Sequence, residues 1–123
     1  MIPPDESVAQ LFRLLGQPVR IQILLVIEQA PACVCHIEAC LGMRQAAISQ
    51  HLMQLRDAGL VEARREGRNV YYALAQPGLM GLVRQAAGLL NAGLSTAPEP
   101  MACPCPRCNP DQPEINCSSE ACP

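Results

Sequence analysis

Apolar residues recur at helical spacing in five separate segments of the chain. They stand three or four positions apart, and each of the first four segments stops at a Gly or Pro, residues that end helices. The pattern predicts helices from about Val8 to Leu15, from Pro18 until Pro31, from His36 to Leu41, from Arg44 to Ala58 and from Leu79 to Leu90. The fold class expected from these segments is mainly α.

The fourth helix has two different faces. Ile48, Leu52 and Leu55 form its buried stripe, while the residues expected to face outward are small or polar, apart from one methionine: Ala46, Ser49, Gln50 and Met53. A short turn after Gly42 joins it to the third helix. A helix-turn-helix typically has two helices joined in this way, and its second helix, the recognition helix, has few apolar residues on its outer face.

Two short strands follow the recognition helix. Val61 to Arg65 and Val70 to Leu74 have strand character, and Glu66-Gly67-Arg68-Asn69 between them suits a hairpin turn. A hairpin at this place in the chain is a wing. The prediction is therefore a winged helix-turn-helix in one domain, residues 1–95.

Residues 96–123 have a different composition. This segment is rich in Pro and Cys, and we expect it to be a disordered C-terminal tail. Half of the whole chain is hydrophobic but only one Phe and two Tyr are aromatic, so the core must consist mostly of Leu, Ile, Val and Ala. A small helical domain of this kind can bury its surplus apolar surface by dimerising.

The role of the cysteines depends on the redox state of the compartment in which the protein lies. The start of the chain has no basic region followed by an apolar run, and the longest apolar run, Ile23 to Ile27, is too short to cross a bilayer. We therefore expect a cytoplasmic protein with no membrane partner. In the cytoplasm, eight cysteines indicate metal binding or redox chemistry rather than structural disulfides.

Cys33-Val34-Cys35 lies about ten residues ahead of the recognition helix. Thiolates are soft donors that select arsenite, Cd, Pb or Zn, and two of them can converge on one ion at the start of a helix. Two ligands do not complete a site. The Cys-Pro-Cys-Pro-Arg-Cys run of the tail offers the preferred additional donors, namely Cys103, Cys105 and Cys108. For Cys40 a buried core thiol is the favoured interpretation, and for His36 a solvent-facing position is at least as plausible as a ligand.

The middle of the chain is basic although the net charge is −2. All nine basic residues are Arg, whose planar fork suits phosphate and guanine. Polar residues of the recognition helix can hydrogen-bond base edges, a small one can meet a thymine methyl, and arginines can hold phosphates. The candidates for base edges are Gln45, Ser49 and Gln50, and the candidate for a thymine methyl is Ala46. The candidates for phosphate contacts are Arg44, Arg64, Arg65 and Arg68. His51 is interpreted as a packing residue.

Three motifs carry a resemblance to a known family. Leu52-x-x-Leu55-Arg56-x-Ala58-Gly59-Leu60-Val61, the wing run from Arg64 to Leu74 and Cys33-Val34-Cys35 resemble the winged-helix repressors of the ArsR/SmtB family, over about residues 8 to 93. The resemblance implies a homodimer, built through the first and fifth helices, that represses transcription on double-stranded operator DNA and is released by a metal or metalloid ion. This chain departs from the family pattern at Gln17, His36 and Arg44.

Other functions remain open at this point. Disulfides of Cys33, Cys35 or the tail thiols would make a redox-sensing repressor on the same scaffold. A metal buffer is a further alternative, although it leaves the wing unexplained. An enzyme is not expected, because Cys35 and His36 are adjacent in sequence and no third group orients them.

Overall fold

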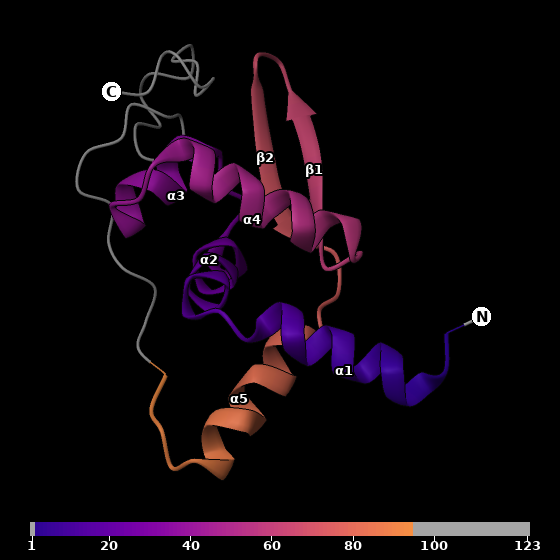
Figure 1. The fold of residues 1–123 in the computed structure, drawn as a ribbon. Coiled ribbons are helices and arrows are strands. Elements are labelled where there is room, and N and C mark those ends of the chain that lie inside the picture. The colour runs from indigo at the N-terminus through magenta and orange to yellow at the C-terminus, as the bar shows by residue number, and fades with distance from the viewer. Residues whose placement is uncertain (1, 95–123) are drawn as a thin grey trace.

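The computed structural model describes residues 2–94 and confirms the winged helix-turn-helix fold (Figure 1). The elements in chain order are α1 (Pro4–Leu15), α2 (Pro18–Gln29), α3 (Val34–Leu41), α4 (Gln45–Asp57), β1 (Val61–Glu66), β2 (Asn69–Leu74) and α5 (Leu79–Leu89). Residues 96–123, predicted to be a disordered tail, lie outside the described residues, and so does the cysteine run within them. The predicted domain boundary near residue 95 stays a prediction.

The helix ends follow from local chemistry. α2 has Pro18 at its first helical position, where a missing N–H costs nothing. α3 stops at Gly42, which has a φ of +66° and donates its backbone N–H to the carbonyl of Glu38. α3 begins two residues before the predicted His36, because the backbone carbonyl of Cys33 already accepts hydrogen bonds from the N–H groups of His36 and Ile37.

The core lies where α2, α3, α4 and α5 meet. Its largest fully buried apolar side chains come from all four helices: Ile23, Leu24, Val26, Ile37, Ile48, Leu52, Leu55 and Met80. The buried stripe predicted for α4 is therefore confirmed. Since every one of these side chains is aliphatic, the core holds the recognition helix by close packing rather than by aromatic stacking.

The wing is an antiparallel hairpin whose register runs from the Val61–Leu74 pair to the Glu66–Asn69 pair. Gly67 in its turn has a φ of +63°, a left-handed conformation that glycine adopts without steric cost. Val61 and Ala73 are buried at the base, whereas Arg65, Glu66 and Arg68 near the tip are exposed and Asn69 beside them is buried. The hairpin is thus anchored in the core at one end and projects away from the helices at the other (Figure 1).

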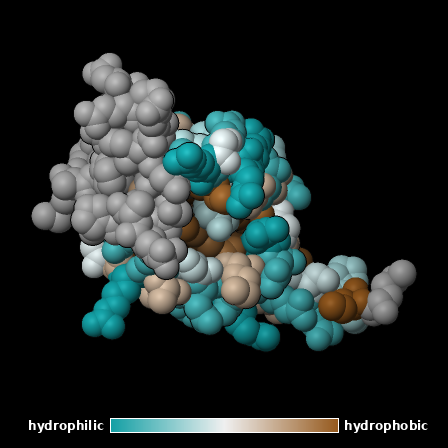
Figure 2. Space-filling model, turned by 90° about the horizontal axis from the view of Figure 1, so that it is seen from above, coloured by the Kyte–Doolittle hydropathy of each residue, from teal (hydrophilic) through white to brown (hydrophobic). Residues whose placement is uncertain are grey.

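Apolar side chains are left exposed on the two terminal helices. Val8 and Phe12 on α1 are about half exposed, and Leu89 and Leu90 at the end of α5 are largely exposed. The first turns of α1 also protrude from the body of the molecule (Figures 1 and 2). Apolar side chains of α1 and α5 are thus left uncovered in the single chain.

None of the helices within residues 2–94 is by itself long and apolar enough to cross a membrane. α1 and α2 together have the necessary length and composition, but they meet at an angle of 86°. Much of α2 is buried in the core.

Candidate DNA-binding face and thiol site

The outer face of α4 presents the residues that the sequence suggested for base contacts. Ala46 and Gln50 are exposed, and Gln45 and Ser49 are half-buried. Arg44 precedes the helix with extended backbone and is also exposed. Because the opposite face of α4 is held in the core, these side chains are presented on a rigid support.

The arginines of the wing differ in their surroundings. Arg65 and Arg68 are exposed. Arg64 donates two hydrogen bonds to Glu62 Oε1, from Nε at 2.9 Å and from NH2 at 2.5 Å. DNA phosphate would have to compete with this carboxylate for Arg64, so the other two arginines are the more available cations.

The wing and α4 enclose a hollow between them. Its volume is about 280 Å³, and it is lined by Ser49, Met53, Arg56, Asp57 and Tyr72. Viewed along the direction in which the wing projects, the described surface is mostly hydrophilic around a small hydrophobic area (Figure 2). The hollow itself has one cation, Arg56, and one carboxylate, Asp57, so the positive charge that a nucleic-acid backbone requires would come from Arg44 and the exposed wing arginines.

The thiols of the Cys33-Val34-Cys35 motif converge at the start of α3. Cys33 is fully buried and Cys35 is 4% exposed, and their sulfur atoms lie 2.9 Å apart. The convergence has a backbone cause: Cys33 is the N-cap of α3 and has extended φ and ψ angles, whereas Cys35 already belongs to the first helical turn. The two sulfurs can therefore bind one ion together, although residues two apart on a regular helix could not.

Cys35 is disulfide-bonded. Within residues 2–94, no group of three or more Cys, His, Asp or Glu side chains is arranged to hold a metal ion. Once Cys35 is reduced, Cys33 and Cys35 can provide two donors of a site. Cys103, Cys105 and Cys108 remain the predicted additional donors.

The two alternative donors near the motif are placed differently from each other. His36 is 5% exposed, so the solvent-facing position considered for it is wrong: the first turn of α3 faces the core rather than solvent at this residue. Cys40 packs against the hydrophobic core, as expected of a core thiol, but it is half-buried rather than buried.

The thiol motif is joined to the wing by backbone hydrogen bonds. Ala32, directly before Cys33, pairs with Tyr72 of β2: Ala32 N–H donates to the Tyr72 carbonyl at 3.0 Å, and Tyr72 N–H donates to the Ala32 carbonyl at 2.8 Å. Two reciprocal hydrogen bonds fix both residues in strand geometry. A displacement of Cys33 would therefore reach β2 through one residue. The sequence pattern did not indicate this bridge, because a single paired residue produces no alternation of apolar and polar positions.

Sequence analysis also missed a buried arginine. Arg20 is 5% exposed and contacts Leu14, His51 and Gln54 through its guanidinium group. Burial lowers the pKa of His51 below its ordinary value, and the charge of Arg20 lowers it further. Arg20 stands in helical register with Ile23, Leu24 and Ile27, and this position within an apolar stripe was the signal available in the sequence.

Comparisons with known proteins agree with this geometry. Residues 17–63 match the family model described as bacterial regulatory protein, arsR family. The chain is 37% identical over 82 residues to a transcriptional repressor SmtB homolog of Synechocystis, covering 67% of this chain and 62% of that protein. It is 41% identical over 64 residues to an arsenic resistance transcriptional regulator of Pseudomonas putida, covering 51% of this chain and 50% of that protein.

A solved structure has the same fold. It is the homodimeric winged helix-turn-helix DNA-binding domain of a possible ArsR-family regulator from Mycobacterium bovis, with a TM-score of 0.64 and 32% sequence identity. The match covers 73% of this chain and 83% of that one. The chain thus spans most of this solved domain but only 62% and 50% of the two curated relatives.

Proposed function

Because the chain belongs to the arsR family of bacterial regulatory proteins, a family of DNA-binding regulators rather than enzymes, we propose that it is a transcriptional repressor controlled by a thiophilic ion. It binds operator DNA in the cytoplasm as a homodimer and releases the DNA when the ion binds. The observation that carries this proposal is the pair of converging sulfurs at Cys33 and Cys35, one residue from the backbone bridge to the wing.

DNA binding is assigned to the outer face of α4 and to the wing. Gln45, Ser49 and Gln50 read base edges in the major groove, and Ala46 contacts a thymine methyl. The arginines that hold phosphates are Arg44, Arg64, Arg65 and Arg68. The exposed or half-buried positions of all these side chains support the assignment.

Dimerisation is assigned to α1 and α5. The exposed side chains of Val8, Phe12, Leu89 and Leu90 would be covered by a second copy, and the related domain from Mycobacterium bovis is homodimeric. Two recognition helices related by a two-fold axis then require an imperfect palindrome with half-sites about one helical turn apart.

The ion-binding step is assigned to Cys33 and Cys35. Arsenite, Cd, Pb and Zn are the ions that thiolates select, and the relative from Pseudomonas putida is by name an arsenic resistance regulator. Each of these ions needs at least one donor beyond two thiolates. Cys103, Cys105 and Cys108 supply it, because tethering holds them at about millimolar effective concentration near the motif.

Release of DNA follows from the position of the motif. When both sulfurs bind one ion through bonds of about 2.3 Å, the ion sets the spacing and direction of the sulfurs. Their present hydrogen-bonded contact does not have this geometry. Cys33 must then move relative to Ala32, and Ala32 is bonded to β2. The wing and the start of α3 shift together, and the DNA contacts of the wing and of α4 can no longer form at the same time.

The test is a titration of the fully reduced protein on a DNA duplex selected from a random-sequence library. Arsenite, Cd, Pb and Zn salts are added separately, and fluorescence anisotropy reports the bound fraction. We expect at least one ion to release the duplex at a stoichiometric ratio. Tight DNA binding that none of the four ions changes would contradict the proposal.

The tail donors are tested by truncation after Ala97. The shortened protein should bind the duplex normally but need about tenfold more ion for release, since it loses the tethered thiols. X-ray absorption should show fewer sulfur ligands per ion than in the full chain. An unaltered ion response and sulfur count would remove Cys103, Cys105 and Cys108 from the site.

Redox sensing on the same scaffold is the second candidate function. It is favoured by one observation: Cys35 is disulfide-bonded while the sulfur of Cys33 lies 2.9 Å away. In this case oxidation alone would release DNA, and a reductant would restore binding without any ion. An ion-dependent release under reducing conditions distinguishes the first function from redox sensing, and binding of ion without release would indicate a metal buffer.

A further inference from the structure

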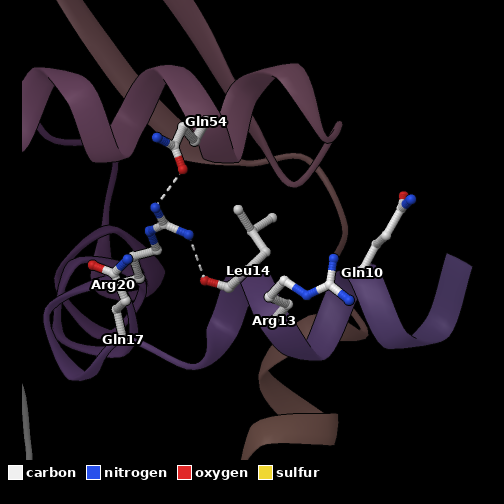
Figure 3. A pocket seen from close by; sticks show the side chains of 6 residues that line it. All are labelled: Gln10, Arg13, Leu14, Gln17, Arg20 and Gln54. Carbon is white, nitrogen blue, oxygen red and sulfur yellow. Dashed lines mark hydrogen bonds between the residues drawn. The ribbon is translucent and has the colours of Figure 1, made fainter. Parts of the chain in front are cut away.

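Arg20 joins three helices through one guanidinium group (Figure 3). Nη1 donates to the carbonyl oxygen of Leu14 at 2.8 Å and Nη2 donates to Gln54 Oε1, as Figure 3 shows. Nε donates to His51 Nδ1 at 3.1 Å. Leu14 belongs to α1, Arg20 to α2, and the other two residues to α4. The guanidinium is thus the polar link between the recognition helix and the helices beneath it.

The geometry of this link constrains α4. His51 and Gln54 are three residues apart, so they lie on the same side of the helix. A guanidinium group is planar and its N–H directions are fixed, so both acceptors must keep their positions relative to that plane. Rotation of α4 about its axis would break both hydrogen bonds. The same rotation would move Ala46 and Gln50 on the outer face.

We propose that Arg20 and His51 are a positioning pair that fixes the rotation of the recognition helix for DNA binding, and that the pair functions only while the His51 ring is neutral. The inference rests on the proposed DNA-binding function. The pair does not contact DNA in this assignment, but it determines how the residues that do so are presented.

The requirement for a neutral ring comes from the hydrogen bond itself. Nδ1 of His51 accepts a hydrogen bond from the N–H at Nε of Arg20, so it needs a free lone pair. Protonation at Nδ1 would put two donors, and two positive charges, face to face. The charge of Arg20 acts on the His51 ring and disfavours the protonated form. The adjoining cavity of about 310 Å³ is lined by Arg13 of α1 as a second cation and, among the described residues, by no acidic side chain.

The lowered pKa of His51 agrees with this arrangement, since both burial and Arg20 favour the neutral ring in the folded protein. The sign of the pH dependence follows. The stabilisation is fully present above the ordinary imidazole pKa of about 6.5 and is lost as the pH falls through the lowered value. Acidification through the lowered pKa of His51 would then weaken DNA binding without any ion.

The experiment measures the Kd for the selected duplex at about pH 7.5 and pH 5.5, either side of the ordinary imidazole pKa. Fluorescence anisotropy gives the Kd, and circular dichroism gives the Tm of each protein at each pH. The variants are His51→Asn, whose amide oxygen can replace Nδ1 as acceptor and does not titrate, and His51→Leu, which has no acceptor. Arg13→Gln is the matched control, because Arg13 lines the same cavity without a described hydrogen bond to α4.

We expect the wild type and Arg13→Gln to lose affinity by about fivefold or more at the lower pH, within the range typical of coupled sites. His51→Asn should bind at pH 7.5 much as the wild type does and keep that affinity at pH 5.5. His51→Leu should bind weakly at both, with a Tm that still shows a folded protein.

Three results would overturn the inference, and one of them also overturns its premise. If His51→Leu is folded and binds as tightly as the wild type, the pair does not position α4. If His51→Asn loses affinity at pH 5.5 as the wild type does, another group is responsible. If the wild type binds no selected duplex at pH 7.5, the proposed DNA-binding function itself fails, and this outcome is distinct from the first two.

Discussion

The outer face of α4 and the thiol pair of α3 belong to consecutive helices but have opposite surroundings. Ala46, Gln50 and Met53 are exposed on a helix whose other side is packed in the core. Cys33 and Cys35 are buried, and the residue before them is bonded to the wing. A change on the exposed face can alter contacts with a partner without disturbing the fold. An ion that binds at the buried thiols must displace neighbouring structure, which suits a control site.

The strongest test of this difference is to remove the soft donors. Cys33→Ser and Cys35→Ser should each abolish ion-induced release while leaving DNA affinity intact, because oxygen keeps the size of the side chain but binds these ions weakly. Anisotropy titrations with the releasing ion measure the effect. Cys40→Ser is the matched control and should respond as the wild type does. Release of either motif variant at the wild-type ion concentration would rule out the pair as the sensor.

Substitutions on the two faces of α4 should also differ in their effect on the free energy of unfolding. Leu55 is fully buried, so Leu55→Ala should lower the free energy of unfolding by about 2–5 kcal/mol through lost contacts and a cavity. Met53 is 57% exposed, and Met53→Ala should change it by no more than about 0.5 kcal/mol. Denaturant unfolding followed by circular dichroism compares them. Equal losses would mean that the outer face of α4 is covered in the folded protein.

The wing arginines should change salt dependence rather than stability. Arg65→Ala and Arg68→Ala should each reduce the slope of log Kd against log salt by about one unit per lost phosphate contact. Arg64→Ala should have a smaller effect, since Glu62 already binds this arginine. Arg13→Ala serves as the control outside the proposed interface. Slopes unchanged in all three wing variants would remove the wing from the DNA contact.

The smallest expected effect concerns the ion pair between α2 and α5. Both oxygens of Glu28 accept hydrogen bonds from Arg84, and these bonds hold the pKa of Glu28 below its ordinary value. The stabilisation is present above the ordinary carboxyl pKa and disappears as the pH falls through the lowered one. Glu28→Gln should therefore lower the Tm slightly at neutral pH and not at all near about pH 2. Arg84→Gln should do the same, and the double variant should show no further loss.

The sequence contained enough to predict the elements of the fold. Five apolar stripes, four of them followed by Gly or Pro, predicted the helices. Gly67 between two short strands predicted the wing. These signals are local and therefore readable in the sequence. The convergence of Cys33 and Cys35 was also predictable, since it needs only a helix start between them. The motifs that resemble the ArsR/SmtB family supported both the predicted elements and the predicted convergence of the two cysteines.

Other features depend on contacts between distant segments and left no such pattern. The pairing of Ala32 with Tyr72 involves one residue on each side, and the burial of His36 depends on how α3 packs. Arg20 was overlooked because a charged residue is ordinarily exposed, and only its acceptors on α1 and α4 explain its burial. The polar groups that control α4 were thus harder to predict than those expected to contact DNA.

In the proposed function, ion binding at the thiols and DNA binding at α4 and the wing oppose each other, and linkage requires this opposition to be reciprocal. The most direct measurement is therefore the affinity of the reduced protein for the releasing ion with and without saturating duplex. We expect the duplex to weaken ion binding by the same factor by which the ion weakens DNA binding. An ion affinity that the duplex leaves unchanged would contradict it.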